Sequence, residues 1–473
     1  MAAHRMCRHC PRKELPTMAS FTKSFKNTGY LQSSVNLLLF FMSWGIWWSF
    51  FQLWLKKDIA EGGLGFTNTQ VGTVYSMNSL ATLILMFLYG TFQDKLGYKR
   101  TIQIFIAAIS ALVGPFVIFV YEPLLHSNFM FGAVLGAIVL SAGFMAGVGL
   151  LEALAERFSR LYNFEYGQAR MWGSFGYAIV ALMAGFLFTI DPKINFWLGS
   201  AMGLLNLIIV VFWKAPAPEG KDSAEQVVEE ATTPSIGEMV GLLKMPALWL
   251  VIVIVFFTWT FYTVFDQQMF PDFYTGLFDS KEAGERTYGV LNSVQVFCEA
   301  AMMGVVPIIM RKIGVRNTLL CGFAVMTLRI LGCAVFADPI VISFVKMFHA
   351  LEVPLCILPV MRYFTLHFNP AMSATLYMVG FQIASQLGNV VLSPVLGALN
   401  DSQGYRFTFF VISAVVACSA VFAFFTLKKD DQQVLGDPFI RETRKPKVEA
   451  PSDITAPVAP SVPATPEDPT ETK

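Results

Sequence analysis

Long apolar runs alternate with short polar segments along almost the whole chain. Each run holds roughly twenty residues, enough for a helix to cross about 30 Å of hydrocarbon. Six runs lie at 34–55, 70–92, 101–121, 129–152, 169–190 and 195–213, and six more at 247–274, 288–310, 317–337, 339–361, 372–399 and 406–427. This pattern predicts an all-α membrane protein with twelve transmembrane helices.

Polar segments divide the chain into five parts. The tail 1–33, the central loop 214–246 and the tail 429–473 flank two six-helix regions at 34–213 and 247–428. The last tail is rich in Pro, Thr, Glu and Lys, a composition that favours disorder. Residues 1–30 lack the short apolar core of a cleavable signal peptide, and Met18 is a candidate start of the natural chain.

The composition indicates a lipid-facing surface. Hydrophobic residues make up 55% of the chain, charged residues only 14%, and mean hydropathy is +0.55, whereas a soluble protein carries about 25% charged residues. The net charge of +1 provides no electrostatic basis for binding nucleic acid. Cys7 and Cys10 lack the second pair of a zinc site, and no nucleotide-binding G-x-x-x-x-G-K-[S/T] motif occurs. We therefore expect no metal, cofactor or enzymatic activity.

Basic residues gather in every second loop, which predicts the orientation of the helices. The loops that follow even-numbered runs contain Lys95, Lys99, Arg100, Arg157, Arg160, Lys214, Lys221, Lys244, Arg311, Lys312 and Arg316, and both tails are basic as well. Lys and Arg are enriched in cytoplasmic loops. We therefore expect both termini and the central loop in the cytoplasm.

One of these loops matches a known signature. After the second run the chain reads G-x-x-x-D-K-x-G-x-K-R, and a shorter R-K-x-G-x-R copy follows the eighth run. The residues of the first copy are Gly90, Asp94, Lys95, Gly97, Lys99 and Arg100. Ordinary loop charge is the alternative interpretation. The spacing resembles the major facilitator superfamily, which implies two six-helix bundles with a site between them near the middle of the membrane.

Eight ionisable residues lie inside the apolar runs, where a charge costs at least about 2.5–3.5 kcal/mol. Lys346, His349 and Glu352 share one side of a helix at i, i+3 and i+6. Burial among apolar neighbours favours the neutral acid of Glu352, so this residue is a candidate proton carrier. Asp266 is the candidate ion-pair partner of Lys346, with a purely structural network as the alternative. The remaining members are Glu152, Arg170, Glu299 and Arg329.

Two further features indicate a sugar site. Glu152 and Arg170 can form a carboxylate–guanidinium pair that offers several hydrogen bonds to sugar hydroxyls, although such a pair could instead close a helical hairpin. Aromatic rings suit the apolar face of a pyranose, and Trp44, Trp47, Trp48 and Tyr177 are the candidates. An interfacial belt or simple packing is the alternative for any one of them.

Five segments resemble one branch of this superfamily, the oligosaccharide–proton symporters. They are NFEYGQARMWGSFGYA (163–178), FYTVFDQQMFPDFY (261–274), TLRILG (327–332), KMFHALEVP (346–354) and SATLYMVGFQIASQLG (373–388), and the resemblance runs from Lys26 to Lys428. It implies that Glu152, Arg170 and Tyr177 bind sugar. It also implies proton coupling by Arg329, His349 and Glu352, and an ion pair between Asp266 and Lys346.

Departures from the lactose-transporting members bear on the substrate. A second Asp–Lys pair of those members is replaced by Thr263 and Ser385, which leaves neither charge buried alone. Their sugar-binding carboxylate on the eighth helix is replaced by Val296, with Gln295 before it and Glu299 three residues later. Sucrose-transporting members look the same at these positions, so Gln295 and Glu299 join the candidate sugar residues.

The resemblance thus implies a secondary active symporter of sucrose and a proton that works by alternating access. It implies a functional monomer in the lipid bilayer of a bacterial inner membrane. Raffinose, melibiose or lactose are alternative substrates, and a sugar sensor that does not transport is an alternative function.

Overall fold

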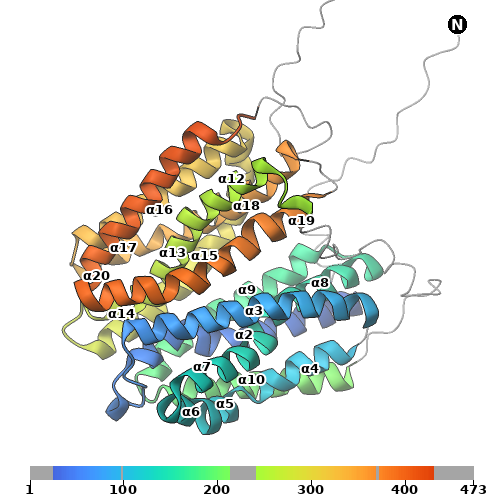
Figure 1. Cartoon of the computed structure of the whole chain (residues 1–473). Helices are drawn as coiled ribbons and strands as arrows, with labels where there is room; N and C mark the ends of the chain where they lie inside the picture. The colour runs from blue at the N-terminus through green and yellow to red at the C-terminus, as the bar shows by residue number, and fades with distance from the viewer. Residues whose placement is uncertain (1–24, 97–99, 214–240, 369–371, 431–473) are drawn as a thin grey trace, which may run out of the picture.

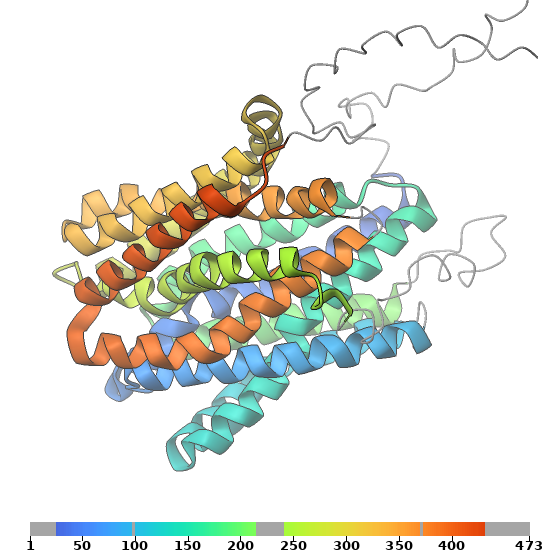
Figure 2. The same cartoon turned by 45° about the horizontal axis from the view of Figure 1, so that its top comes forward.

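The computed structural model describes residues 25–96, 100–213, 241–368 and 372–430, and every regular element among them is a helix. Most of these helices are long and run side by side (Figures 1 and 2). Figure 1 shows the helices of the first half, in blue to green, packed together below those of the second half, in lime to red.

Helices of the first half begin with α2 (Thr28–Lys56), the short 3-10 helix η1 (Ile59–Glu61), α3 (Asn68–Leu96) and α4 (Arg100–Ala111). They continue through α5 (Val113–Phe116), the π-helix η2 (Val117–Tyr121), α6 (Glu122–Ser127), α7 (Phe129–Leu140), the π-helix η3 (Ser141–Met145), α8 (Ala146–Tyr162), α9 (Tyr166–Phe188) and α10 (Lys193–Phe212).

Helices of the second half begin with α12 (Pro246–Val255), the π-helix η4 (Phe256–Thr260), α13 (Phe261–Val264), the π-helix η5 (Phe265–Met269) and α14 (Phe270–Thr275). They continue through α15 (Lys281–Ile313), α16 (Val315–Val335), α17 (Pro339–Met347), α18 (His349–His367), α19 (Ser373–Tyr377), the π-helix η7 (Met378–Ile383) and α20 (Ala384–Thr426).

Side-chain caps, a proline and a glycine explain several helix ends. Asn27 accepts hydrogen bonds from two backbone N–H groups at the start of α2, and Ser280 accepts one at the start of α15. Asp338 caps α17, where Pro339 takes the first helical position, at which a missing N–H costs nothing. Gly314, with φ of 89°, follows α15 in a conformation that side chains disfavour.

The described residues contain ten helices long and apolar enough to span a membrane, or eleven if the bent pair Thr101–Ala111 and Val113–Ser127 is one span. The last of them, Thr375–Thr426, has 52 residues and is interrupted at Gly404, whose φ is 78°. A straight helix of that length would measure about 78 Å, more than twice the hydrocarbon thickness. Dividing it at Gly404 and joining the bent pair leads to the twelve spans that the sequence predicts.

Hydrogen bonds and ion pairs join the two halves at one end, on the left of Figure 1. The Asp401 carboxylate, in the second half, accepts from the backbone N–H groups of Asn68 and Thr69 at 2.9 and 2.8 Å, and so caps α3 of the first half. Lys56 pairs with Asp272 at 2.9 Å, and Tyr405 bonds to the same carboxylate. We call this group of six residues the end clasp.

A close backbone approach adds to this contact. Helix α3 runs beside the first part of α20 (Figure 2), and the Ser76 hydroxyl donates to the Val390 carbonyl at 2.7 Å. A Cβ atom on Gly72 would lie 2.2 Å from the Ser393 carbonyl oxygen, so a side chain there would force the helices apart. The end clasp therefore sits on two tightly packed helices.

Candidate functional site

A cavity of about 360 Å³ is lined by residues from both halves, within the size range of small-molecule sites. Its walls combine aromatic rings with groups that form hydrogen bonds. The first half contributes Phe41, Trp48, Ser49, Gln52, Tyr75, Arg170, Ser174 and Tyr177. The second half contributes, among others, Trp259, Tyr262, Thr263, Asp266, Asn292, Gln295, Glu299 and His349.

Arg170 is the cationic group of the first half at this cavity. Its Nε donates to Glu152 Oε1 at 2.5 Å, its Nη1 donates to the Ser174 hydroxyl at 3.2 Å, and its guanidinium lies 4.2 Å from the centre of the Phe41 ring. Ring and carboxylate thus hold the guanidinium plane in place. The structure brings together the two residues that the sequence pairs, although only Arg170 lines the cavity.

Aromatic residues of α2 differ from the prediction. Trp47 is 1% exposed and packs against Phe144 and Phe196, with ring centres 5.1 and 5.9 Å away. Neither Trp47 nor Trp44 lines the cavity, whereas Trp48 does. The direct sugar contact of Trp44 and Trp47 therefore stays a prediction that this cavity does not support, and Trp48 is the tryptophan of α2 placed for such a contact. Successive helical residues point about 100° apart, and a run of tryptophans does not reveal which one faces the site.

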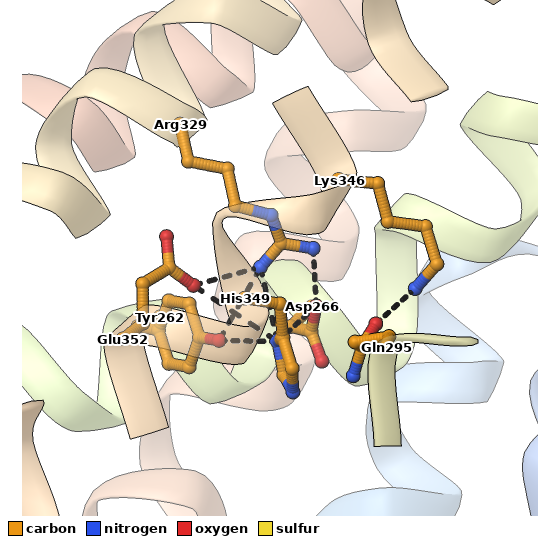
Figure 3. Close-up of polar contacts among 7 residues, drawn as sticks. All are labelled: Tyr262, Asp266, Gln295, Arg329, Lys346, His349 and Glu352. Carbon is orange, nitrogen blue, oxygen red and sulfur yellow. Dashed lines mark hydrogen bonds and ion pairs between the residues drawn. The ribbon is translucent and has the colours of Figure 1, made fainter. Parts of the chain in front are cut away.

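Arg329 lies at the centre of a buried cluster behind the cavity (Figure 3). It is 0% exposed, as is Glu352. Its Nη2 donates to Asp266 Oδ1 at 2.6 Å and its Nη1 donates to Glu352 Oε2 at 3.1 Å. One cation thus faces two carboxylates. A proton on Glu352 would leave Arg329 and Asp266 as a neutral pair.

His349 and Tyr262 connect this cluster to the cavity. The Tyr262 hydroxyl lies 2.5 Å from His349 Nδ1, and Arg329 Nη1 donates to the same hydroxyl at 3.3 Å. His349 Nδ1 is also 3.2 Å from Asp266 Oδ1. Tyr262, Asp266 and His349 line the cavity, whereas Glu352 does not. A proton passing between the cavity and Glu352 therefore has polar groups along its way.

Lys346 does not form the ion pair predicted with Asp266. Its Nζ donates to Gln295 Oε1 at 2.6 Å (Figure 3), and Asp266 pairs with Arg329 instead. The planar guanidinium reaches two carboxylates at once, which a compact ammonium group does not do as well. The amide oxygen of Gln295 satisfies the ammonium in place of a carboxylate.

Several cavity residues escaped the sequence analysis because their types are common in packed helices. Gln52 is 2% exposed, and neither atom of its amide has a hydrogen-bond partner within the described chain. It lies four residues after Trp48, hence on the same face of α2. Asn292 likewise precedes Gln295 by three residues, so helical periodicity from the predicted Gln295 and Glu299 could have identified it.

The predictions for the signature loop and the chain ends concern residues that the structure does not describe. Gly97 and Lys99 lie outside the described residues, and the side chains of Gly90, Asp94, Lys95 and Arg100 are not described either. The tail 1–24, most of the central loop and the tail 431–473 are also outside. No cluster of His, Cys, Asp and Glu in the described part could hold a metal ion.

Comparison with known proteins decides the family. Residues 22–438 match the family described as the LacY proton/sugar symporter. The chain belongs to this family. Members of the LacY symporter family are transporters and not enzymes, and the long apolar helices make this chain a multi-pass inner-membrane protein.

Named relatives in the LacY symporter family cover most of the chain. A sucrose permease of Escherichia coli is 44% identical over 411 residues, 87% of this chain and 96% of the relative. A raffinose permease of Escherichia coli is 34% identical, covering 85% of this chain and 93% of the relative. A lactose permease of Klebsiella oxytoca is also 34% identical, covering 80% and 90%.

Solved structures support the fold. The nucleoside transporter NupG superposes with a TM-score of 0.70 at 14% identity, over 85% of this chain and all of the other. A D-xylose–proton symporter superposes with a TM-score of 0.61, also at 14% identity, over 88% of this chain and all of the other. The predicted all-α major facilitator fold is thereby confirmed.

Proposed function

We propose that this LacY family symporter carries sucrose across the membrane together with a proton, by alternating access. The observation that carries the proposal is the Arg329 cluster, in which two carboxylates share one buried cation directly behind a cavity of disaccharide scale. In such a cluster one carboxylate can carry the transported proton while the other stays paired with the cation. The 44% identity to a sucrose permease supports sucrose as the sugar.

Sugar binding falls to residues on both walls of the cavity. Arg170, held by Glu152, would donate to sugar hydroxyls from the first half, and Tyr177 would stack on a pyranose face. Gln295 and Glu299 would provide a donor and an acceptor from α15. A sugar that contacts both walls draws the halves together, which is the step that alternating access requires.

Proton coupling falls to Glu352, with His349 and Arg329 as its partners. Sugar would bind best when Glu352 is protonated, because the cluster is then neutral. After the sugar leaves, Arg329 stabilises the carboxylate and so favours release of the proton. The empty carrier then returns.

The orientation and the division of the chain complete the proposal. Residues 34–213 and 247–428 form the two moving bundles, 214–246 is the cytoplasmic loop between them, and both tails are cytoplasmic. The end clasp would then lie on the periplasmic side and close the cavity there. One chain supplies both walls of the cavity, which supports a monomer as the functional unit.

Sugar-dependent proton movement tests this function. Addition of sucrose to lightly buffered, de-energised cells that express the chain should make the medium alkaline. Raffinose, melibiose and lactose, added separately, establish the sugar range. Sucrose entry without a pH change would identify a uniporter and refute proton coupling, whereas a response only to another sugar would refute sucrose as the substrate.

A further inference from the structure

Lys346 is a buried cation whose closest polar partner is neutral. It is 2% exposed, and within the described residues no carboxylate lies at ion-pair distance from its Nζ. The nearby carboxylates of Asp266 and Glu352 bond to Arg329. The ammonium group instead lies 2.6 Å from Gln295 Oε1 and about 5 Å from the ring centres of Phe270 and Tyr288. Burying a charge is costly, and no ion pair offsets that cost for Lys346. Another role must therefore explain a lysine at this position.

The contact between Lys346 and Gln295 determines which way the amide faces. An ammonium group only donates hydrogen bonds, so it can donate to the amide oxygen but not bond to the amide NH2. The Nε2 of Gln295 must therefore point away from Lys346 (Figure 3). Gln295 lines the cavity, and its Nε2 has no protein acceptor in the described chain.

Other groups on the same face of α15 complement this donor. Asn292, Gln295 and Glu299 follow at helical spacing, and all three line the cavity. Glu299 forms no ion pair or hydrogen bond with another described side chain, so its carboxylate is free to accept. The wall thus offers an oriented donor beside a free acceptor, the combination that recognises a sugar hydroxyl and a neighbouring oxygen.

We propose that Lys346 is a positioning residue for sugar recognition, which fixes the Gln295 amide so that its NH2 donates to an oxygen of the bound sugar. The proposal rests on the sugar-binding function proposed above. In this scheme Lys346 acts through Gln295 and takes no part in proton coupling. Without Lys346, the Gln295 side chain regains its rotamers and both orientations of its amide, and only some of these present the donor to the sugar.

Direct sugar binding to the purified full-length chain tests this role. The wild type is titrated with sucrose, raffinose, melibiose and lactose, and the variants are compared with the sugar that binds best. Lys346→Met, which keeps the length of the side chain, should weaken binding about five- to tenfold, as expected for one hydrogen bond inside a protein. Gln295→Ala should weaken it by a similar factor. The double variant should match Gln295→Ala within about twofold, because the lysine has nothing left to position.

Three controls separate positioning from a structural or coupling role. Lys346→Arg keeps a cationic donor and should bind better than Lys346→Met. Gln295→Glu keeps an oxygen for Lys346 but has no NH2, so it should bind as weakly as Gln295→Ala in a protein that folds normally. Phe344→Met, at a site on α17 that is 72% exposed, is the matched control and should bind like the wild type. The ratio of protons to sugar in Lys346→Met should equal that of the wild type.

Specific results overturn the proposal. Independent losses from Lys346→Met and Gln295→Ala that multiply in the double variant would show that the lysine does not act through the amide. Unchanged affinity with an altered proton-to-sugar ratio would assign Lys346 to coupling. If Lys346→Met does not fold, wild-type affinity in Gln295→Glu refutes the donor role by itself. If the wild type binds none of the four sugars, the proposed function and this proposal are both overturned. If the wild type binds a sugar but the variants give any of the contrary results just described, only this proposal is overturned.

Discussion

Replacement of Glu352 by glutamine tests the centre of the proposed coupling mechanism. The side chain is fully buried, and its Oε2 accepts from Arg329 Nη1 at 3.1 Å, an interaction that an amide oxygen can retain. Its other oxygen has no partner in the described chain. Glutamine is nearly isosteric with the protonated acid, so Glu352→Gln should resemble the carrier with its proton permanently bound. Such a carrier can bind sugar and move it, but it cannot release a proton.

The loss of sugar accumulation expected for Glu352→Gln can be calculated, because a single carboxyl group exchanges the coupled proton. One elementary charge that crosses about 100 mV releases about 2.3 kcal/mol. Since about 1.36 kcal/mol corresponds to a tenfold change, coupling to one proton supports about 50-fold accumulation of sugar at that potential. The variant should reach only about equal concentrations on both sides. The buried amide NH2 should also lower stability by about 1–3 kcal/mol, because it replaces an atom that has no partner.

Two assays in the same vesicles separate coupling from binding. Accumulation is measured as uptake of labelled sucrose under an imposed membrane potential. Exchange is measured as counterflow, in which labelled sucrose enters vesicles preloaded with unlabelled sucrose. The variant should lose the accumulation and keep the counterflow. Loss of both activities in folded protein would mean that Glu352 is needed for binding, and retention of both would assign the coupling proton to another group, with His349 and Glu299 the next candidates.

Three further predictions concern the cavity walls and the end clasp. Arg170→Lys keeps the charge but not the planar set of donors, so sugar affinity measured on purified protein should fall at least about tenfold; a change within twofold would make Arg170 structural. Trp47→Ala should lower the melting temperature and leave sugar affinity unchanged, while Trp48→Ala weakens binding, and the opposite result would contradict the cavity lining. Asp401→Ala removes the cap on α3, which stabilises the closed end clasp by about 1 kcal/mol. In a variant with the native cysteines replaced and a cysteine at position 52 of the cavity, an impermeant thiol reagent added from outside should therefore react about fivefold faster. An unchanged rate would show that the end clasp does not keep this side of the cavity closed.

The apolar spans and the charges inside them can be predicted from the sequence because their physical causes are local. A span needs about twenty apolar residues, whatever surrounds it, and a charge inside such a span is costly enough to mark a site. The segments around Arg170, Asp266 and Glu352 also carry the resemblance that the family match confirms. The roles of these residues in binding and coupling stay predictions until the assays above are done.

Contacts between helices could not be obtained in the same way. Spacing places Lys346 and Glu352 on one side of a helix, but it contains no information about the distance to Asp266 or Arg329 on neighbouring helices. The structure brings Asp266 to Arg329 and turns Lys346 to Gln295. It also places Trp48 at the cavity, while Trp47 packs among rings of its own half. The apolar character of the helices and the supply of buried charges thus follow from the sequence alone. Which charges pair and which ring meets the sugar are decided by how the helices rotate and cross, because both depend on close packing across the whole bundle.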